Sequence, residues 1–404
     1  MSVCTMTGSA AGSSPFPGLP ARRYVDPEAL RLECEAVLWK EWQLAGHVSD
    51  LPAAGTALRY DLAGRSALVI KGADGTLRAF RNACRHRGAR LVEGDRGTQL
   101  AFCVDSRLRC PYHGWTYDDA GRLVHLPDAE DHPGLDRSAF GLAELPLATW
   151  NGFVFVAFGT AAPRGSPWLG SGAIPADVGA SAMRRIEEPV IERVAANWKV
   201  VCEQMLDRAH IDVAQPVLRS MCAETPRSSV HEDVPALEAP LDGRSAATWS
   251  VRAYGSALAR GATAGAAGVP CWRRLLLGSN TFLDLWPGLV RVIQVLPEHA
   301  TATLVREVTY ARPETSSAAR SERYLNARLW RRVRRTSLGL CERVQRGLAS
   351  QAAGPGPIGS GELALRHFIQ RVRNAEVDAP EPASTEGDTR PTARPTRSRR
   401  RSRA

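Results

Sequence analysis

Two short groups of cysteine and histidine constrain this chain more than any other feature. Cys84 and His86 form a Cys-x-His pair that is followed by Arg-Gly, and Cys110 and His113 form a Cys-x2-His pair within the segment Cys-Pro-Tyr-His-Gly-Trp. Two thiolates and two imidazoles can hold a two-iron cluster in which the cysteines bind one iron and the histidines bind the other. The sequence therefore predicts a [2Fe–2S] centre with Cys84, His86, Cys110 and His113 as its metal ligands and cofactor-binding residues.

Two other interpretations of these residues are open. A structural zinc site also uses Cys and His, but its usual spacings are Cys-x2–4-Cys and His-x3–5-His. Coincidence among nine Cys and nine His is the second alternative. Neither explains the residues that flank the two pairs, which resemble the two cluster-binding loops of Rieske proteins.

The connection between the two loops departs from that resemblance. Twenty-three residues separate His86 from Cys110, which is more than is usual in Rieske proteins. Cys103 would fit a shorter spacing, but Ser106 stands where its paired histidine should be. Cys103 is therefore predicted to be an ordinary buried thiol, and the extra residues are expected to lengthen the connection around residues 98–109.

Length and composition limit the class of protein. A chain of 404 residues is long enough for two domains with substantial cores. It contains no apolar run long enough to span a bilayer, so a membrane role is not expected. The first residues do not resemble a signal peptide, and the cysteines show no disulfide framework. These features predict a cytoplasmic protein.

The net charge of +10 is concentrated at one end of the chain. Seven arginines lie between Arg390 and Arg403, and without residues 389–404 the net charge is only about +3. This tail has no large apolar residue, which predicts disorder. Because aromatic residues do not alternate with basic ones, nucleic-acid binding is not expected to be the main function.

Hydrophobic patterns divide the rest of the chain into two structural classes. Asp26 and Pro27 mark the start of a helix, and short β-rich runs separated by turn residues then fill residues 40–160. Residues 220–270 lack clear periodicity and are expected to form loops around a pocket. Further expected elements are a helix that begins near Asn197, strands at 282–286, 290–295 and 303–310, and helices at 321–348 and 362–372.

This order of elements, with an Asn-Trp-Lys segment at 197–199, resembles the α subunits of Rieske non-haem iron oxygenases. The resemblance includes choline- and carnitine-type monooxygenases and aromatic-ring-hydroxylating dioxygenases. It implies an α+β fold in which an all-β Rieske domain precedes a catalytic domain built on an antiparallel sheet flanked by helices. It also implies electron transfer from a ferredoxin or flavin-dependent reductase, a trimer, and a small organic substrate.

The resemblance also gives domain boundaries. The expected segments are a flexible N-terminus at 1–18, an N-terminal helix of the catalytic-type domain at 19–39, the Rieske domain at 40–160, the catalytic-type domain at 161–375 and a disordered Arg-rich tail at 376–404.

In this family two histidines and one carboxylate bind a mononuclear Fe(II). His210 matches the first histidine, and Asp207 matches an acid that links the iron to the cluster of a neighbouring subunit. On one continuous helix the two residues would be neighbours at i and i+3; a solvated acid is the alternative for Asp207. Gln215 occupies the second histidine position and Ser337 the carboxylate position. Only one of three iron ligands is therefore retained.

Three hypotheses follow. The first is an oxygenase component that uses electrons from a reductase for O2-dependent hydroxylation or demethylation, with Asp207 and His210 as catalytic residues and His210 as a metal ligand. The second is an iron-deficient, non-catalytic Rieske subunit that partners a ligand-complete paralogue in a hetero-oligomer. The third, a separate electron carrier, leaves the large second domain without a purpose.

Overall fold

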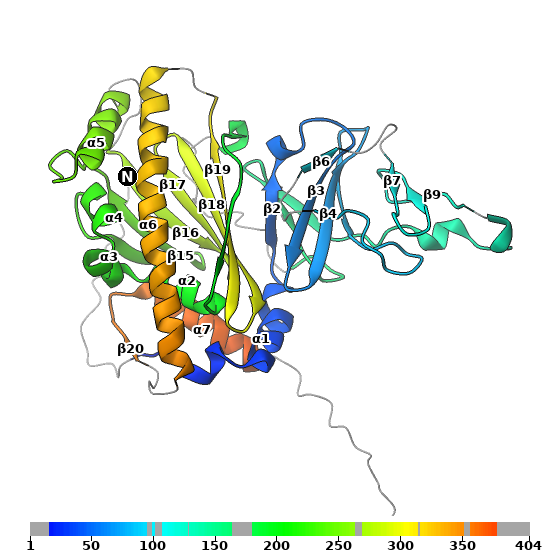
Figure 1. Ribbon diagram of the computed structural model, residues 1–404, viewed down its shortest axis with the longest axis horizontal. Coiled ribbons are helices and arrows are strands. Elements are labelled where there is room, and N and C mark those ends of the chain that lie inside the picture. Colours follow the sequence, from blue (N-terminus) through cyan, green and yellow to red (C-terminus); the bar gives the residue numbers. More distant parts are fainter. Residues whose placement is uncertain are drawn as a thin grey trace, which may run out of the picture.

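The computed structural model describes residues 16–94, 99–101, 107–127, 129–163, 180–262, 269–313, 316–350 and 356–377. The predictions for Cys103, for residues 1–15 and for the Arg-rich tail lie outside these residues. The described residues form an all-β lobe and an α+β lobe built on a large antiparallel sheet (Figure 1), which confirms the predicted fold class. Residues 16 and 17, within the expected flexible N-terminus, form β1 (Phe16–Pro17), which pairs with β20 (Pro357–Ile358).

The N-terminal helical segment belongs to the α+β lobe. Asp26 caps α1 (Pro27–Glu33) by accepting a hydrogen bond from the Glu28 amide, as the sequence predicted, and a π-helical turn follows at Cys34–Leu38. The buried Glu33 carboxylate accepts hydrogen bonds from Arg23, Trp198 and Lys199, each at 2.8 Å. These bonds tie this N-terminal segment to the helix that begins at Trp198.

The first lobe consists of strands and short 3-10 turns in the described residues. Its strands form one four-stranded sheet in the order β5-β4-β3-β6 and two three-stranded sheets, β10-β11-β2 and β7-β8-β9. The strands are β2 (Gln43–His47), β3 (Thr56–Leu62), β4 (Arg65–Lys71), β5 (Leu77–Arg81), β6 (Gln99–Ala101), β7 (Leu108–Arg109), β8 (Thr116–Tyr117), β9 (Leu123–His125), β10 (Leu147–Trp150) and β11 (Phe153–Val156). All four residues of β11 are fully buried.

The second lobe is organised by an eight-stranded antiparallel sheet in the order β12-β19-β18-β17-β16-β15-β14, with β13 also paired to β19. The strands predicted at 282–286, 290–295 and 303–310 are confirmed as β17, β18 and β19. The strands are β12 (Arg184–Arg185), β13 (Val190–Val194), β14 (Arg227–His231), β15 (Val234–Pro240), β16 (Cys271–Leu277), β17 (Thr281–Trp286), β18 (Leu289–His299) and β19 (Ala302–Ala311).

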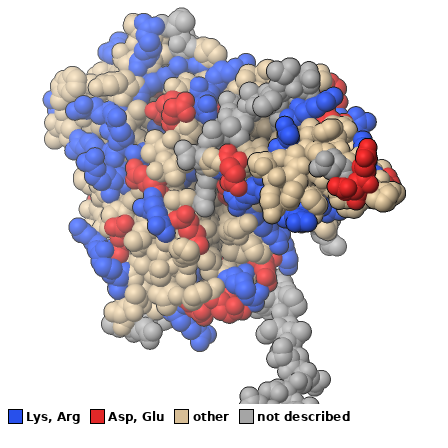
Figure 2. Space-filling model, turned by 45° about the vertical axis from the view of Figure 1, so that its right-hand side comes forward, with Lys and Arg blue, Asp and Glu red and all other residues tan. Residues whose placement is uncertain are grey.

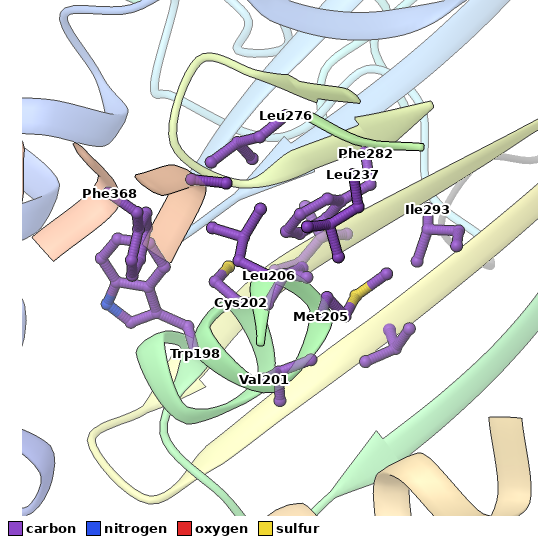
Figure 3. Packing of buried hydrophobic residues seen from close by; sticks show 14 of the residues in the cluster. Trp198, Val201, Cys202, Met205, Leu206, Leu237, Leu276, Phe282, Ile293 and Phe368 are labelled. Atoms are coloured by element: carbon purple, nitrogen blue, oxygen red, sulfur yellow. The ribbon is translucent and has the colours of Figure 1, made fainter. Parts of the chain in front are cut away.

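Helices cover this sheet, and the long α6 crosses the molecule beside it (Figure 1). The helices are α2 (Trp198–Leu206), α3 (Arg208–Ala214), α4 (Pro216–Met221), α5 (Trp249–Ala262), α6 (Ser317–Ala349) and α7 (Leu363–Val377). In Figure 3, α2 directs Trp198, Cys202 and Leu206 into the core that it shares with the sheet. Trp198 packs edge-on against Phe368 of α7 at 5.8 Å between ring centroids, so α2 is held from two sides.

The expectation of loops at 220–270 was wrong for most of that segment. Residues 227–231 and 234–240 are the paired strands β14 and β15, and α5 begins at Trp249. β15 is held on its other edge by β16. These strands therefore depend on pairing with a distant segment, which the local sequence does not reveal.

Basic residues are distributed over the surface. On the face shown in Figure 2, Lys and Arg are spread over both lobes with Asp and Glu among them. Among the described residues, no helix combines the length and the apolar character that crossing a membrane requires.

Candidate metal centres

The two predicted cluster loops have the same backbone geometry. In each, the glycine four residues after the cysteine donates its amide to the cysteine carbonyl, at 2.9 Å from Gly88 to Cys84 and at 3.1 Å from Gly114 to Cys110. Both glycines have positive φ, +74° and +72°, a conformation that residues with a Cβ rarely adopt. The Cys-to-Gly spacing in the sequence therefore produces two equivalent turns.

These turns bring the four predicted ligands together. Cys84 and Cys110 are buried, and burial raises the pKa of the Cys84 thiol, to which the adjacent Cys110 thiol adds. The His86 and His113 rings are 4.7 Å apart between centroids, with His86 partly exposed and His113 exposed. The thiols thus lie on the protein side of the site and the imidazoles on its solvent side.

Tyr117 and Trp115 support this arrangement from β8 and the residue before it. The buried Tyr117 hydroxyl lies 3.2 Å from Cys84 Sγ and accepts the Arg85 amide at 3.0 Å. Since the oxygen accepts from Arg85, its hydrogen is available for the Cys84 sulfur. Trp115 stacks on His86 at 4.7 Å between centroids and 4° between planes, which fixes the orientation of that imidazole.

The residues present fit a Rieske cluster. Nδ1 of His86 is buried without a hydrogen-bond partner in the described part of the chain, so a ring nitrogen of one ligand is left unsatisfied. In those same residues no three His, Cys, Asp or Glu side chains converge on one ion position; a Rieske centre needs only two ligands for each iron. When bound, such a cluster gains and loses single electrons.

The second predicted centre lies in the α+β lobe, between α2, α3, α4 and α6. The expectation that one helix runs through Asp207 and His210 was wrong. The chain bends at Asp207 (φ −78°, ψ 103°), and this residue ends α2 and caps α3. Asp207 Oδ1 accepts the His210 backbone amide at 2.9 Å. The carboxylate is therefore used as a helix cap, a third role beside the two that the sequence suggested.

His210 lies in a network of neutral polar side chains. Its Nε2 is 2.5 Å from the Gln204 amide nitrogen, which also donates to Ser337 Oγ at 3.1 Å. The buried Gln215 amide donates to the same Ser337 oxygen at 2.7 Å. The three positions matched to the family's iron ligands, His210, Gln215 and Ser337, are thus brought together.

This donor set does not fit a mononuclear Fe(II). Fe(II) sites of this kind use two imidazoles and a carboxylate, whereas here one imidazole meets two amides and a hydroxyl. Burial lowers the pKa of His210, Asp207 opposes this shift, and the Arg274 guanidinium lowers the pKa further. Either orientation of the Gln204 amide engages Nε2 of His210.

Residues downstream of His210 have other contacts. Asp212 is exposed and forms an ion pair with Arg219 at 2.9 Å, and Glu224 lies 3.4 Å from Arg227. Cys222 is buried, and burial raises the pKa of its thiol to about 12. His231 is exposed at the end of β14. In the described structure none of these four residues joins the His210 network.

Sequence reasoning missed Trp115, Tyr117 and Gln204. The alternation of side chains in a strand offered a signal for the first two, since residues i and i+2 after the His113 loop point to one side. For Gln204 the sequence offered none, because its contacts depend on the bend at Asp207 and on the distant α6.

Comparison with protein families agrees with this division into two lobes. Residues 41–146 match the Rieske [2Fe–2S] domain, and residues 180–375 match the catalytic domain of ring-hydroxylating α subunits. An all-β domain with a two-Cys, two-His centre followed by this α+β domain defines a Rieske oxygenase component. The chain belongs to the family of Rieske oxygenase α subunits, as the sequence predicted.

Individual relatives point to the same family. The glycine betaine monooxygenase oxygenase subunit of Pseudomonas aeruginosa is 30% identical over 200 residues, which are 50% of this chain and 45% of the relative. That of Chromohalobacter salexigens is 27% identical over 373 residues, which cover 84% of this chain and 81% of the relative. The chain thus spans less than half of the first relative and most of the second.

Solved structures share the fold. The quaternary ammonium Rieske monooxygenase CntA, solved with an inhibitor, superposes with a TM-score of 0.72 at 20% identity, covering 89% of this chain and 95% of that chain. The predicted domain boundaries and the roles of Asp207 and His210 stay predictions.

Proposed function

We propose that this chain is an electron-accepting Rieske component of an O2-dependent hydroxylation or demethylation of a small organic substrate, and that the oxygen chemistry takes place on a ligand-complete paralogous subunit. The network of His210, Gln204, Gln215 and Ser337 carries this proposal, because neutral side chains that hydrogen-bond to one another occupy and surround the positions of the family's iron ligands. The electron donor is a ferredoxin or a flavin-dependent reductase, and the proposed location is the cytoplasm.

The cluster residues provide the electron-accepting part of the proposed function. Cys84, Cys110, His86 and His113 hold the [2Fe–2S] cluster, with the exposed His113 side available to a partner protein. Tyr117 and Trp115 hold these ligands in place through the contacts at Cys84 and His86.

The second candidate function is an oxygenase in its own right, arranged as a homotrimer. The retained His210, capped through Asp207, and membership of an enzyme family favour it. In this case the relatives named glycine betaine monooxygenase and carnitine monooxygenase favour a quaternary ammonium compound as the substrate class, whereas those named chlorobenzene dioxygenase and biphenyl dioxygenase favour an aromatic compound.

A single-turnover experiment separates the two candidates. The purified chain is reduced with dithionite and mixed with O2 in the presence of glycine betaine or carnitine, and reoxidation and product are followed. We expect slow reoxidation that neither compound accelerates and that His210→Ala leaves unchanged. Demethylated or hydroxylated product formed in proportion to the cluster, and lost in His210→Ala, would establish the second candidate instead.

A further inference from the structure

A cavity of about 380 Å³ lies between α6 and the edge of the large sheet. Its walls come from the segment that joins β12 to β13, from β18 and β19, and from the first half of α6. Val190, Leu289 and Trp330 supply apolar surface, and Tyr324 stands beside them. The volume falls within the range of pockets that bind small molecules.

The polar lining of the cavity is mainly cationic. Four arginines, Arg291, Arg323, Arg331 and Arg334, line it together with two carboxylates, Glu187 and Glu307. If all six groups are charged, the lining has an excess of two positive charges. Pockets with one sign of charge and low-dielectric walls attract ligands of the opposite sign.

The carboxylates do not neutralise all of these arginines. Glu307 is occupied by Trp330 and Arg334, each 2.9 Å away, and Arg334 also pairs with Glu192 at 2.8 Å. Glu187 is exposed to solvent, so its charge is screened by water.

Arg291 is a buried cation of this lining. Its side chain is only 2% exposed, one end donates to the neutral Asn326 at 2.9 Å, and its face lies 4.6 Å from the centroid of the Trp330 ring. Its Nη1 is buried without a hydrogen-bond partner, and no carboxylate of the described residues forms an ion pair with it. Glu307, Asp284 and Glu187 act on this guanidinium only without direct ion pairs. Burial of a guanidinium that lacks a direct ion pair costs free energy, and an anion in the adjoining cavity would reduce that cost.

We propose that this cavity binds a small organic anion, a carboxylate with an aromatic or aliphatic body. The carboxylate would lie toward Arg291, with Arg331 and Arg323 nearer the opening, and the apolar body would pack on Trp330 and Leu289. This site differs from the His210 network, because none of the residues of that network lines the cavity.

Isothermal titration with benzoate tests the proposal, and neutral benzamide of nearly the same shape is the matched probe. We expect benzoate to bind more tightly than benzamide and to lose affinity as salt is added. Arg291→Met should weaken benzoate binding by roughly tenfold or more, because one charge-assisted contact is removed. Arg331→Gln should give a smaller loss of benzoate affinity. This variant provides the test if Arg291→Met does not fold.

Arg328→Gln is the control, because this exposed arginine lies on the same helix but does not line the cavity. It should leave benzoate affinity unchanged. Equal binding of benzoate and benzamide, no benzoate binding at about 10 mM, or an equal loss of affinity in Arg328→Gln and Arg331→Gln would each overturn the proposal.

Discussion

The Tyr117 hydroxyl contacts the sulfur of Cys84, one of the predicted cluster ligands. It lies 3.2 Å from Cys84 Sγ, is fully buried, and has its other hydrogen-bonding position filled by the Arg85 amide. Hydrogen bonds to ligand sulfurs withdraw electron density and help to set the reduction potential of iron–sulfur clusters. The effect of Tyr117 should therefore be seen in the potential.

Tyr117→Phe should lower the reduction potential of the cluster by up to roughly 65–130 mV. A hydrogen bond to a charged acceptor contributes about 1.5–3 kcal/mol, and about 1.4 kcal/mol corresponds to about 59 mV for a one-electron couple. Tyr60→Phe is the matched control, because this buried tyrosine of the same lobe donates to Gln43 instead. Potentials from protein-film voltammetry that are equal in the two variants would contradict the role of Tyr117.

The two turns that carry the proposed cluster ligands were predictable from the sequence because each turn is local. Each pair lies within a five-residue turn, and the glycine that closes the turn is part of the same motif. Gln204 was not predictable, because its contacts join residues from three separate helices.

At the level of elements, the buried Glu33 joins α1 to α2. Its carboxylate pairs with Lys199, which is fully buried, and with Arg23. Removing one partner of a buried pair leaves the other charge uncompensated, which costs more than the pair contributed.

Glu33→Gln should lower the free energy of unfolding by roughly 3–5 kcal/mol. Glu35→Gln, two residues along the chain, should cost less than about 1 kcal/mol, because its ion pair with Arg31 is exposed. Urea denaturation followed by circular dichroism gives both values. Equal losses in the two variants would show that burial of the Lys199 pair is not what stabilises this junction.

The bend between α2 and α3 depends on the Asp207 cap. Asp207→Ala should destabilise the protein by about 1 kcal/mol, whereas Asp207→Asn, which keeps an acceptor oxygen, should cost only a few tenths. Thermal unfolding of the two variants measures this difference. If Asn is as costly as Ala, the charge of Asp207, and not its cap, is what stabilises the bend.

Two helix starts were predictable from their caps. Asp26 and Asn197 both cap helices through contacts within three residues, so the sequence signal and the structure coincide. The strands at 227–240 and the bend at Asp207 were not predicted, because the first depend on pairing with β16 and the second on one carboxylate that replaces a helical hydrogen bond.

For the whole molecule, the two candidate centres lie far apart. Figure 1 shows β7 and β9, beside the cluster loops, at one end of the long axis, and α3, which carries His210, at the opposite side. An electron accepted by the first lobe is therefore held far from the α3 of the same chain. This arrangement supports the proposal that the chain works in an oligomer.

The fold of the whole molecule was predictable because both lobes follow local patterns and a family resemblance. The metal content of the second centre is a different kind of question. It depends on whether Gln215 and Ser337, which the sequence placed at the ligand positions, satisfy one another or a metal.

The most direct test is quantification of iron and acid-labile sulfide in the protein purified after expression with iron and sulfur in excess. The proposed function predicts about two iron and two sulfide per chain, unchanged in His210→Ala, and an additional iron in Gln215→His combined with Ser337→Asp if the pocket accepts it. A tightly held third iron in the unmodified protein that is lost in His210→Ala would contradict the account, since His210 would then be a metal ligand with neutral partners.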